Sequence, residues 1–458
     1  MAAGHPATVA AGIEALEAGG SAADATVASC LASCVAETVM TGFLGGGHAI
    51  YLDAASGRIR NLDCFVAVPG LGGDGREAEL LELEVPFGTE LVHYAVGIAS
   101  CGVPGLPAGL GALHSEHGRL PWPRLVEPAL RLAENGVRLP PAHASCLAML
   151  APVMTMNEGA RIYSPGGEVL PAGATLEQPG LVRALELLAD EGPESAYRGA
   201  LGEALLELMD ERGGLVTQED LHAYRARWAE PVEIAYSGTR FFTRGDLSGV
   251  PETLPRLPAL AGLSPAERAF ALVTTLDSRA GNGHTTSLTT VDPDGNACVL
   301  TTSLGLGSGD FLPGLDLHLN SMLGESDLIN GPLEPGERMG SMMAPSLALD
   351  SGGLVLAIGA AGGTRLRSAL LQVAAGILDE ELDPEEAVSR PRLHAAAGIV
   401  QLEPGFDPDV ARSLEEAGYE VRAWPEQHHY FGGVSAVART GAAGDPRRSG
   451  AATTLRQA

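Results

Sequence analysis

The chain has 458 residues, of which 57 are acidic and 29 basic, so its formal net charge is −28, and 45% of its residues are hydrophobic. Such a charge repels nucleic acid and anionic membrane surfaces, so we expect neither as a partner. All basic residues are arginine, and the absence of lysine excludes Schiff-base chemistry and a lysine-held pyridoxal cofactor. By length, one large layered domain or two to three smaller domains are both allowed.

The cysteines lie among apolar residues without a Cys-x-x-Cys pair, which predicts buried free thiols in a reducing compartment. They are Cys30, Cys34, Cys64, Cys101, Cys146 and Cys298. Residues 1–20 lack a signal-peptide pattern, and no window is long and apolar enough for a membrane span. We therefore expect a cytoplasmic protein; whether an upstream segment was removed is left open.

The first regular elements are predicted to be helices. Val9, Ile13 and Leu16 share one helical face that ends before Gly19, and Ser21 can cap a following helix. Further helices are expected within 120–156, 181–189 and 201–209. The run 45–47 of three glycines could cradle a phosphate, but close approach of two layers is the simpler interpretation. Residues 238–284 are irregular apart from a predicted helix over Pro265–Leu276.

The sequence 281–291 places a Gly/Asn-rich segment and His284 directly before Thr285 and Thr286, which open a predicted strand. If the chain were cleaved before Thr285, its hydroxyl would be a nucleophile and its new α-amino group the base. The alternative is an ordinary loop that enters a strand rich in β-branched threonine.

A returning strand over 297–303 follows the turn 292–295. Folding the chain about this turn pairs positions that sum to roughly 587, so Thr285 is expected to face Thr301 or Thr302. A second hydroxyl there could orient the first, or the pair could only stabilise the sheet.

An apolar strand over 354–359 leads into Gly362, Gly363 and Thr364, followed by apolar residues at helical spacing. Thr364 is the predicted N-cap. Backbone N–H groups at such a helix start suit a phosphate or the oxyanion of an acyl-transfer intermediate, and the lack of lysine favours the oxyanion. A purely structural strand-to-helix turn is the other interpretation.

Taken in order, these segments resemble γ-glutamyltransferases over nearly the whole chain. The similar segments are Gly4–Thr8, Gly19–Ala25, Gly42–Gly47, Thr285–Thr286, Asp292–Ala297, Leu319–Met322, Pro335–Arg338, Ser341–Pro345 and Ala361–Arg365. The family implies an α+β four-layer αββα sandwich of the N-terminal-nucleophile hydrolase type.

The resemblance also implies cleavage between His284 and Thr285, giving portions 1–284 and 285–458, with 238–284 as the linker before the processing site. Thr285 matches the nucleophile and Thr301 the threonine that hydrogen-bonds it. Gly362 and Gly363 match the oxyanion hole. Ser341 matches the first of two pocket serines.

The γ-glutamyl-binding positions depart from the family. Met342 replaces the second serine, Phe65 the carboxylate-binding arginine and Ser303 an amine-binding asparagine. Leu323 and Gly324 replace paired aspartates, with Glu325 adjacent; Ser287 also replaces the usual histidine. Loss of a charged partner changes specificity strongly, so we expect a substrate other than glutathione.

We therefore expect a self-processing threonine hydrolase or acyltransferase, its fragments held as a tight heterodimer and a higher oligomer left open. It would act on a small non-γ-glutamyl carbonyl substrate without cofactor or metal, because His428 and His429 lack a third ligand at fitting spacing. One alternative is a carbon–carbon-cleaving hydrolase, like homologues in lincosamide and pyrrolobenzodiazepine pathways that act on a 4-alkylproline precursor. Another is an unprocessed binding protein.

Overall fold

The computed structural model describes residues 1–73, 75, 78–87, 90–277, 285–329 and 331–455. The predicted segment from Gly281 to His284 lies outside these ranges, and so does the bond proposed for cleavage.

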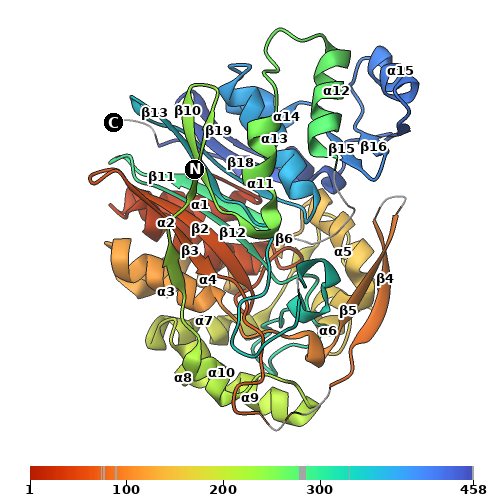
Figure 1. The fold of residues 1–458 in the computed structure, drawn as a ribbon. Helices are drawn as coiled ribbons and strands as arrows, with labels where there is room; N and C mark the ends of the chain where they lie inside the picture. The colour runs from red at the N-terminus through yellow and green to blue at the C-terminus, as the bar shows by residue number, and fades with distance from the viewer. Residues whose placement is uncertain (74, 76–77, 88–89, 278–284, 330, 456–458) are drawn as a thin grey trace.

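Two antiparallel sheets stack face to face at the centre of the molecule (Figure 1). In the described part of the chain the first sheet has seven strands, in the order β20 (Ala451–Ala452), β1 (Ala2–Ala3), β11 (Thr286–Val291), β12 (Ala297–Ser303), β2 (Gly46–Asp53), β3 (Arg58–Cys64) and β8 (Arg227–Ala229). The second has six, in the order β19 (Gly441–Gly444), β18 (Gly433–Ala438), β14 (Gly353–Ala361), β13 (Ser346–Asp350), β10 (Thr239–Thr243) and β9 (Val232–Tyr236). Apolar side chains such as Ile50, Val299 and Leu347 fill the space between them.

Helices cover the outer face of each sheet, which completes four layers and confirms the predicted αββα sandwich. The first sheet carries α1 (Pro6–Glu17), α2 (Ala22–Ala36), α3 (Leu106–His117) and α4 (Trp122–Asn135) on its side of the molecule. The second carries α13 (Arg365–Leu378) and α14 (Pro384–Ser389), with α12 (Pro265–Leu276) and α15 (Pro408–Glu416) beside them.

The remaining elements surround this sandwich. The helices are α5 (Pro141–Met154), α6 (Gly159–Tyr163), α7 (Pro179–Glu191), α8 (Ser195–Arg198), α9 (Ala200–Arg212), α10 (Gln218–Ala223) and α11 (Val250–Thr253). The smaller sheets are the hairpins β4 (Leu81–Phe87) with β5 (Glu90–Val96) and β6 (Val137–Arg138) with β7 (Thr175–Leu176), and the set β15 (Leu393–Ala396), β16 (Ile399–Leu402) and β17 (Glu420–Ala423).

Strand β11 is buried on both faces because α2 covers one and the second sheet covers the other. Side chains alternate along a strand, so even and odd positions face different layers. The Thr290 hydroxyl meets Thr26 of α2, whereas that of Thr289 meets Ser435 of β18. Thr285, an odd position just before the strand, is therefore directed between the sheets.

The strands 286–291 and 297–303 and the helix Pro265–Leu276 form as predicted. Ser21 caps α2 through a reciprocal capping box with Asp24, as local sequence indicates. Thr364 occupies the N-cap position of α13 but makes no side-chain capping hydrogen bond, which differs from the prediction.

In the described part of the segment 238–284, the first residues form β10 inside the second sheet. The predicted helix α12 buries Leu272, Val273 and Leu276 in the core below that sheet. All six cysteines are described and buried, as predicted, and Cys30, Cys34, Cys64, Cys101 and Cys298 are free. Among the described residues no helix has the length and hydrophobicity that crossing a bilayer requires.

Candidate active site

Thr285 lies at the centre of the candidate site, where β11 begins. Its side chain is only 4% exposed. The backbone N–H of Gly362 donates a hydrogen bond to its hydroxyl oxygen at 3.3 Å. The structure therefore brings together the predicted nucleophile and the first predicted oxyanion-hole amide, although they are far apart in sequence.

Gly362 and Gly363 connect the end of β14 to the start of α13. Both have positive φ, at 131° and 57°, which favours glycine. A Cβ on Gly362 would lie 2.9 Å from the Gly432 Cα, so there is also no space for a side chain. This turn directs the Gly362 amide, near the positive end of the α13 dipole, at the Thr285 hydroxyl.

The register between β11 and β12 differs from the prediction. Thr286 pairs with Thr302 and Ser287 with Thr301, so Thr285 faces neither Thr301 nor Thr302. Instead the Thr301 hydroxyl lies 3.3 Å from that of Ser287. The predicted contact between Thr301 and Thr285 is therefore wrong. Continuing the register places Ser303, two residues after Thr301, opposite Thr285.

A buried polar network lies on the helix side of the threonine pair, and sequence reasoning missed it. Glu37, directly after α2, accepts hydrogen bonds from Thr286 at 2.6 Å and Thr8 at 2.7 Å. Arg448 donates to the Thr285 carbonyl oxygen at 3.3 Å. Burial raises the pKa of Glu37 and lowers that of Arg448. The opposite charges of the two groups act against these shifts and partly offset them.

This network borders a cavity of about 20 Å³, lined in part by Glu37, Thr285, Thr286, Arg448 and His143. The volume is enough for one water molecule. The His143 ring nitrogen meets the Arg448 carbonyl oxygen at 3.1 Å. Closely packed polar groups therefore surround Thr285 on the side of this cavity.

A second small cavity, of about 30 Å³, opens on the other side of Thr285. It is lined by the predicted nucleophile, one predicted oxyanion-hole glycine, every predicted substrate-binding residue and four apolar residues that the sequence did not indicate. They are Thr285, Gly363, Phe65, Ser303, Glu325, Ser341, Met342, Met322, Leu328, Met343 and Leu366. Thr301 is not among them.

Glu325 is the one ionisable side chain among these lining residues. Burial raises its pKa to about 8, and the nearby Asp327 raises it further in the same direction. Its Oε1 atom has no hydrogen-bond partner among the described residues. Burial, and then the charge of Glu325, raise the pKa of Tyr94 of β5, whose hydroxyl is also buried without a partner in the described chain.

Phe65 occupies the position where the family resemblance implies a carboxylate-binding arginine. It is 1% exposed, and its ring stacks on His48 with centroids 5.5 Å apart. The nearby Arg338 is engaged elsewhere: its guanidinium lies over the Tyr224 ring at 4.0 Å and 3.5 Å from Asp63. Arg338 does not line the cavity, so it does not replace the missing arginine.

The loop that carries Ser341 and Met342 is held by residues that precede Thr285 in sequence. The Ser341 N–H donates to the Asp246 carboxylate at 2.9 Å, and Arg244 donates to the Ser341 carbonyl oxygen at 3.0 Å. In the described ranges no group of three histidine, cysteine or acidic side chains could hold a metal. His428 instead accepts a hydrogen bond from the Tyr430 amide.

An αββα sandwich with a buried threonine at the start of a central strand, facing backbone amides, defines the class of N-terminal-nucleophile hydrolases. The family model for Gamma-glutamyltranspeptidase matches residues 8–264 and 262–455, so the chain belongs to this family.

Two curated relatives illustrate its range. The chain is 29% identical over 505 residues to the Acylase ACY 1 proenzyme of Pseudomonas sp. (strain V22), covering 95% of this chain and 88% of that protein. It is 27% identical over 531 residues to the glutathione hydrolase proenzyme of Pseudomonas aeruginosa, covering 95% and 90%. Both are named proenzymes, which implies that members of the family cleave themselves into two chains.

Among solved structures, cephalosporin acylase from Bacillus halodurans is similar over the whole fold. The TM-score is 0.83, at 24% sequence identity, and the match covers 100% of this chain and 96% of the other. At that identity the likeness supports the four-layer fold and says nothing about the substrate.

Proposed function

We propose that this protein is a self-processing amide hydrolase whose nucleophile is Thr285, freed by cleavage of the bond after His284, and whose substrate is not a γ-glutamyl compound. The observation that carries the proposal is the 3.3 Å hydrogen bond from the Gly362 amide to the Thr285 hydroxyl. It aims an oxyanion donor at the atom that would attack.

In the proposed reaction the new α-amino group of Thr285 takes the hydroxyl proton while the oxygen attacks the substrate carbonyl. The amides of Gly362 and Gly363 stabilise the oxyanion of the tetrahedral intermediate. The carbon–nitrogen bond then breaks, and the proton moves from the threonine amine to the leaving amine. Water cleaves the ester at Thr285 by the same steps and releases a carboxylic acid.

Ser303 takes the orienting role that sequence reasoning gave to Thr301, because the strand register sets it opposite Thr285. Ser303 and Thr285 line the same cavity, whereas the Thr301 hydroxyl meets Ser287.

The side chains that line the cavity, rather than its volume of about 30 Å³, support an acyl group with an apolar body. Phe65, Met322, Leu328, Met342 and Met343 line it, and methionine adapts its shape to a bound group. Glu325 supplies one polar contact, as a donor when protonated or as an anion towards a substrate amine. The 29% identity to an enzyme named acylase supports this substrate class.

The decisive experiment is intact-mass analysis of the purified protein, compared with Thr285→Ala and Thr285→Ser. We expect the wild-type protein to consist of two fragments divided between His284 and Thr285. Thr285→Ala should stay intact and inactive, whereas Thr285→Ser, which keeps hydroxyl and amine, should still be cleaved. A wild-type chain that remains whole on long incubation would support the binding-protein alternative instead.

A carbon–carbon-cleaving reaction needs the same nucleophile and oxyanion hole, with a stabilised carbanion as the leaving group. Turnover of a β-dicarbonyl compound, with anilides of similar size left intact, would favour that reaction over amide hydrolysis.

A further inference from the structure

A larger cleft, of about 660 Å³, lies away from Thr285 and has no role in the proposed reaction. Its volume falls in the range of small-molecule sites, roughly 300–1,000 Å³. It sits beyond the C-terminal end of α13, whose first turn adjoins the oxyanion glycines. Because a helix rises about 1.5 Å per residue, the fourteen residues of α13 separate the two sites by roughly 20 Å.

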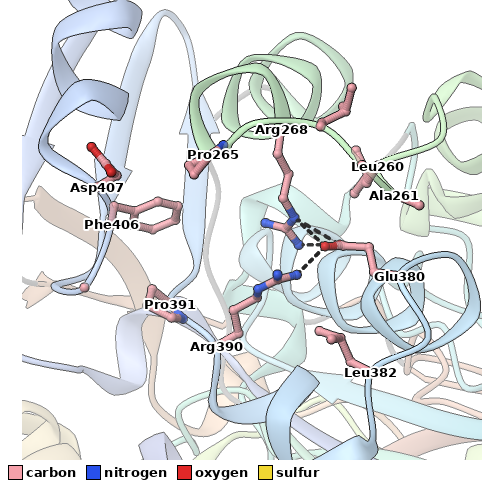
Figure 2. Close-up of a pocket in the computed structure, with 13 residues that line it drawn as sticks. Leu260, Ala261, Pro265, Arg268, Glu380, Leu382, Arg390, Pro391, Phe406 and Asp407 are labelled. Atoms are coloured by element: carbon pink, nitrogen blue, oxygen red, sulfur yellow. Dashed lines mark hydrogen bonds and ion pairs between the residues drawn. The ribbon is translucent and has the colours of Figure 1, made fainter.

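Two arginines in this cleft share one carboxylate (Figure 2). The Arg268 Nε lies 3.0 and 3.1 Å from the two Glu380 carboxylate oxygens, and Arg390 donates to the same group. The side chain of Arg268 is 11% exposed and that of Arg390 35%. Burial, and then the charge of Arg390, lower the pKa of Arg268, as expected beside a second cation.

The cluster carries one positive charge in excess, and its donors are not exhausted. Two guanidinium groups offer ten N–H bonds, whereas Glu380 accepts only a few of them. The Arg268 Nη1 and the Arg390 Nε and Nη2 have no partner in the part of the chain that the structure describes. Asp407 also lines the cleft and accepts from the Asp409 amide, and Asp379, next to Glu380 in sequence, accepts from the Leu260 and Ala261 amides.

Apolar groups complete the cleft. Figure 2 shows the Phe406 ring and Pro391 across the space from Arg268 and Glu380, and the loop before α12 closes another side. The apolar lining residues are Leu260, Leu263, Pro265, Leu382, Pro391 and Phe406. Leu263 is 37% exposed, so its side chain is available to contact a bound group.

We propose that this cleft is a second ligand site, which binds a small organic carboxylate with an aromatic or alkyl body. The carboxylate would take the unused N–H groups of Arg390 and Arg268, since guanidinium binds carboxylate strongly and with directional geometry. The apolar body would pack on Phe406 and Leu263. Residues on both sides of Thr285 in sequence would contact the ligand, but the site does not depend on cleavage.

The test is titration of the whole protein with 4-phenylbutyrate by isothermal calorimetry, with 4-phenylbutanol as the uncharged analogue. We expect one saturable site for the acid and at least tenfold weaker binding of the alcohol. Arg390→Gln should weaken binding of the acid about 10- to 100-fold and Arg390→Lys less, because lysine keeps the charge but not the planar fork. Arg412→Gln, an exposed arginine of α15 paired with Asp409, should leave it unchanged.

Phe406→Ala tests the apolar half independently and should also weaken binding tenfold or more. Comparison of unfolding midpoints confirms that each variant is folded. Equal affinity of wild type and Arg390→Gln would overturn the proposal by placing the ligand elsewhere, such as at Thr285. No binding at 10 mM, or equal binding of acid and alcohol, would also overturn it. None of these outcomes depends on whether Thr285 is the nucleophile.

Discussion

The two sides of Thr285 are built differently. Towards α2 the threonine pair meets Glu37 and Arg448 through buried hydrogen bonds, of 2.6 Å from Thr286 to Glu37 and 3.3 Å from Arg448 to the Thr285 carbonyl oxygen. Towards the substrate cavity it meets mainly apolar side chains, several of them methionine. A rigid polar side suits atoms that must stay in place during bond breaking, whereas an adaptable apolar side can change its substrate without disturbing that geometry. Under the proposed function, this difference allows the predicted reacting groups to be present while the γ-glutamyl contacts are absent.

The largest effect should appear on the substrate side, with matched anilides. γ-Glutamyl-p-nitroanilide carries an amine and a carboxylate that butyryl-p-nitroanilide lacks. Each lost charged contact is worth roughly 1.5–3 kcal/mol, so we expect kcat/KM for the γ-glutamyl compound to fall about 10²- to 10⁴-fold below that of an ordinary γ-glutamyltransferase.

The butyryl compound should be the better of the two substrates for the processed protein. The assay uses protein already cleaved before Thr285, so that an absence of turnover cannot result from missing processing. Comparable or faster γ-glutamyl turnover would mean that another group performs the role of the missing arginine.

A second test separates two hydroxyls on β12. Ser303→Ala should lower kcat about 10- to 1000-fold, the range typical for one orienting or stabilising group. Thr301→Val, which keeps the side-chain shape, should cost less than about tenfold, because its hydroxyl contacts Ser287. A larger loss of kcat in Thr301→Val than in Ser303→Ala would instead support the orienting role that the sequence assigned to Thr301.

On the polar side, Glu37→Leu leaves the hydroxyls of Thr8 and Thr286 without their buried acceptor. We expect the free energy of unfolding to fall by roughly 1–3 kcal/mol per hydroxyl, measured by urea denaturation. The control is Glu17→Leu at the exposed end of α1, where a change within about 0.5 kcal/mol is expected. Equal effects at the two positions would show that the network does not stabilise the site.

A further effect concerns pH and the buried carboxyl group of Glu325. Because the pKa of Glu325 is raised from 4.5 to about 8, the folded protein keeps this proton while the unfolded chain loses it. The contribution of Glu325 to the free energy of unfolding is therefore fully present below pH 4.5. It is lost as pH rises to about 8, by at most about 1.4 kcal/mol per pH unit.

Glu325→Gln should remove this part of the pH dependence, as measured by denaturation at pH 5, 6, 7 and 8. Asp327, Tyr94 and Arg365 are charged or titratable groups that act on the same region, so the difference between wild type and variant is the quantity to compare. An unchanged difference across these pH values would contradict a neutral Glu325.

Much of the fold follows from local sequence. Proline and a capping serine set the start of α12, and the turn 292–295 sets the ends of β11 and β12. The register between β11 and β12 did not follow from local sequence. Side chains alternate with a period of two, which does not distinguish neighbouring strand pairings, so only packing against α2 and β14 selects the observed register. The sequence indicated the substrate-side residues through family resemblance. Arg448 and Glu37 carry no local signal, because they meet Thr285 and Thr286 only in the folded chain.

The burial of Thr285 has a practical consequence for chemical labelling. Since the sequence contains no lysine, an amine-directed reagent can modify only α-amino groups, one for each polypeptide. Cleavage before Thr285 would double that number, and the new amine would lie beside a cavity of about 30 Å³. Counting labels by mass on the denatured protein would therefore count processed molecules. A series of reagents of increasing size measures how far the cavity opens in solution.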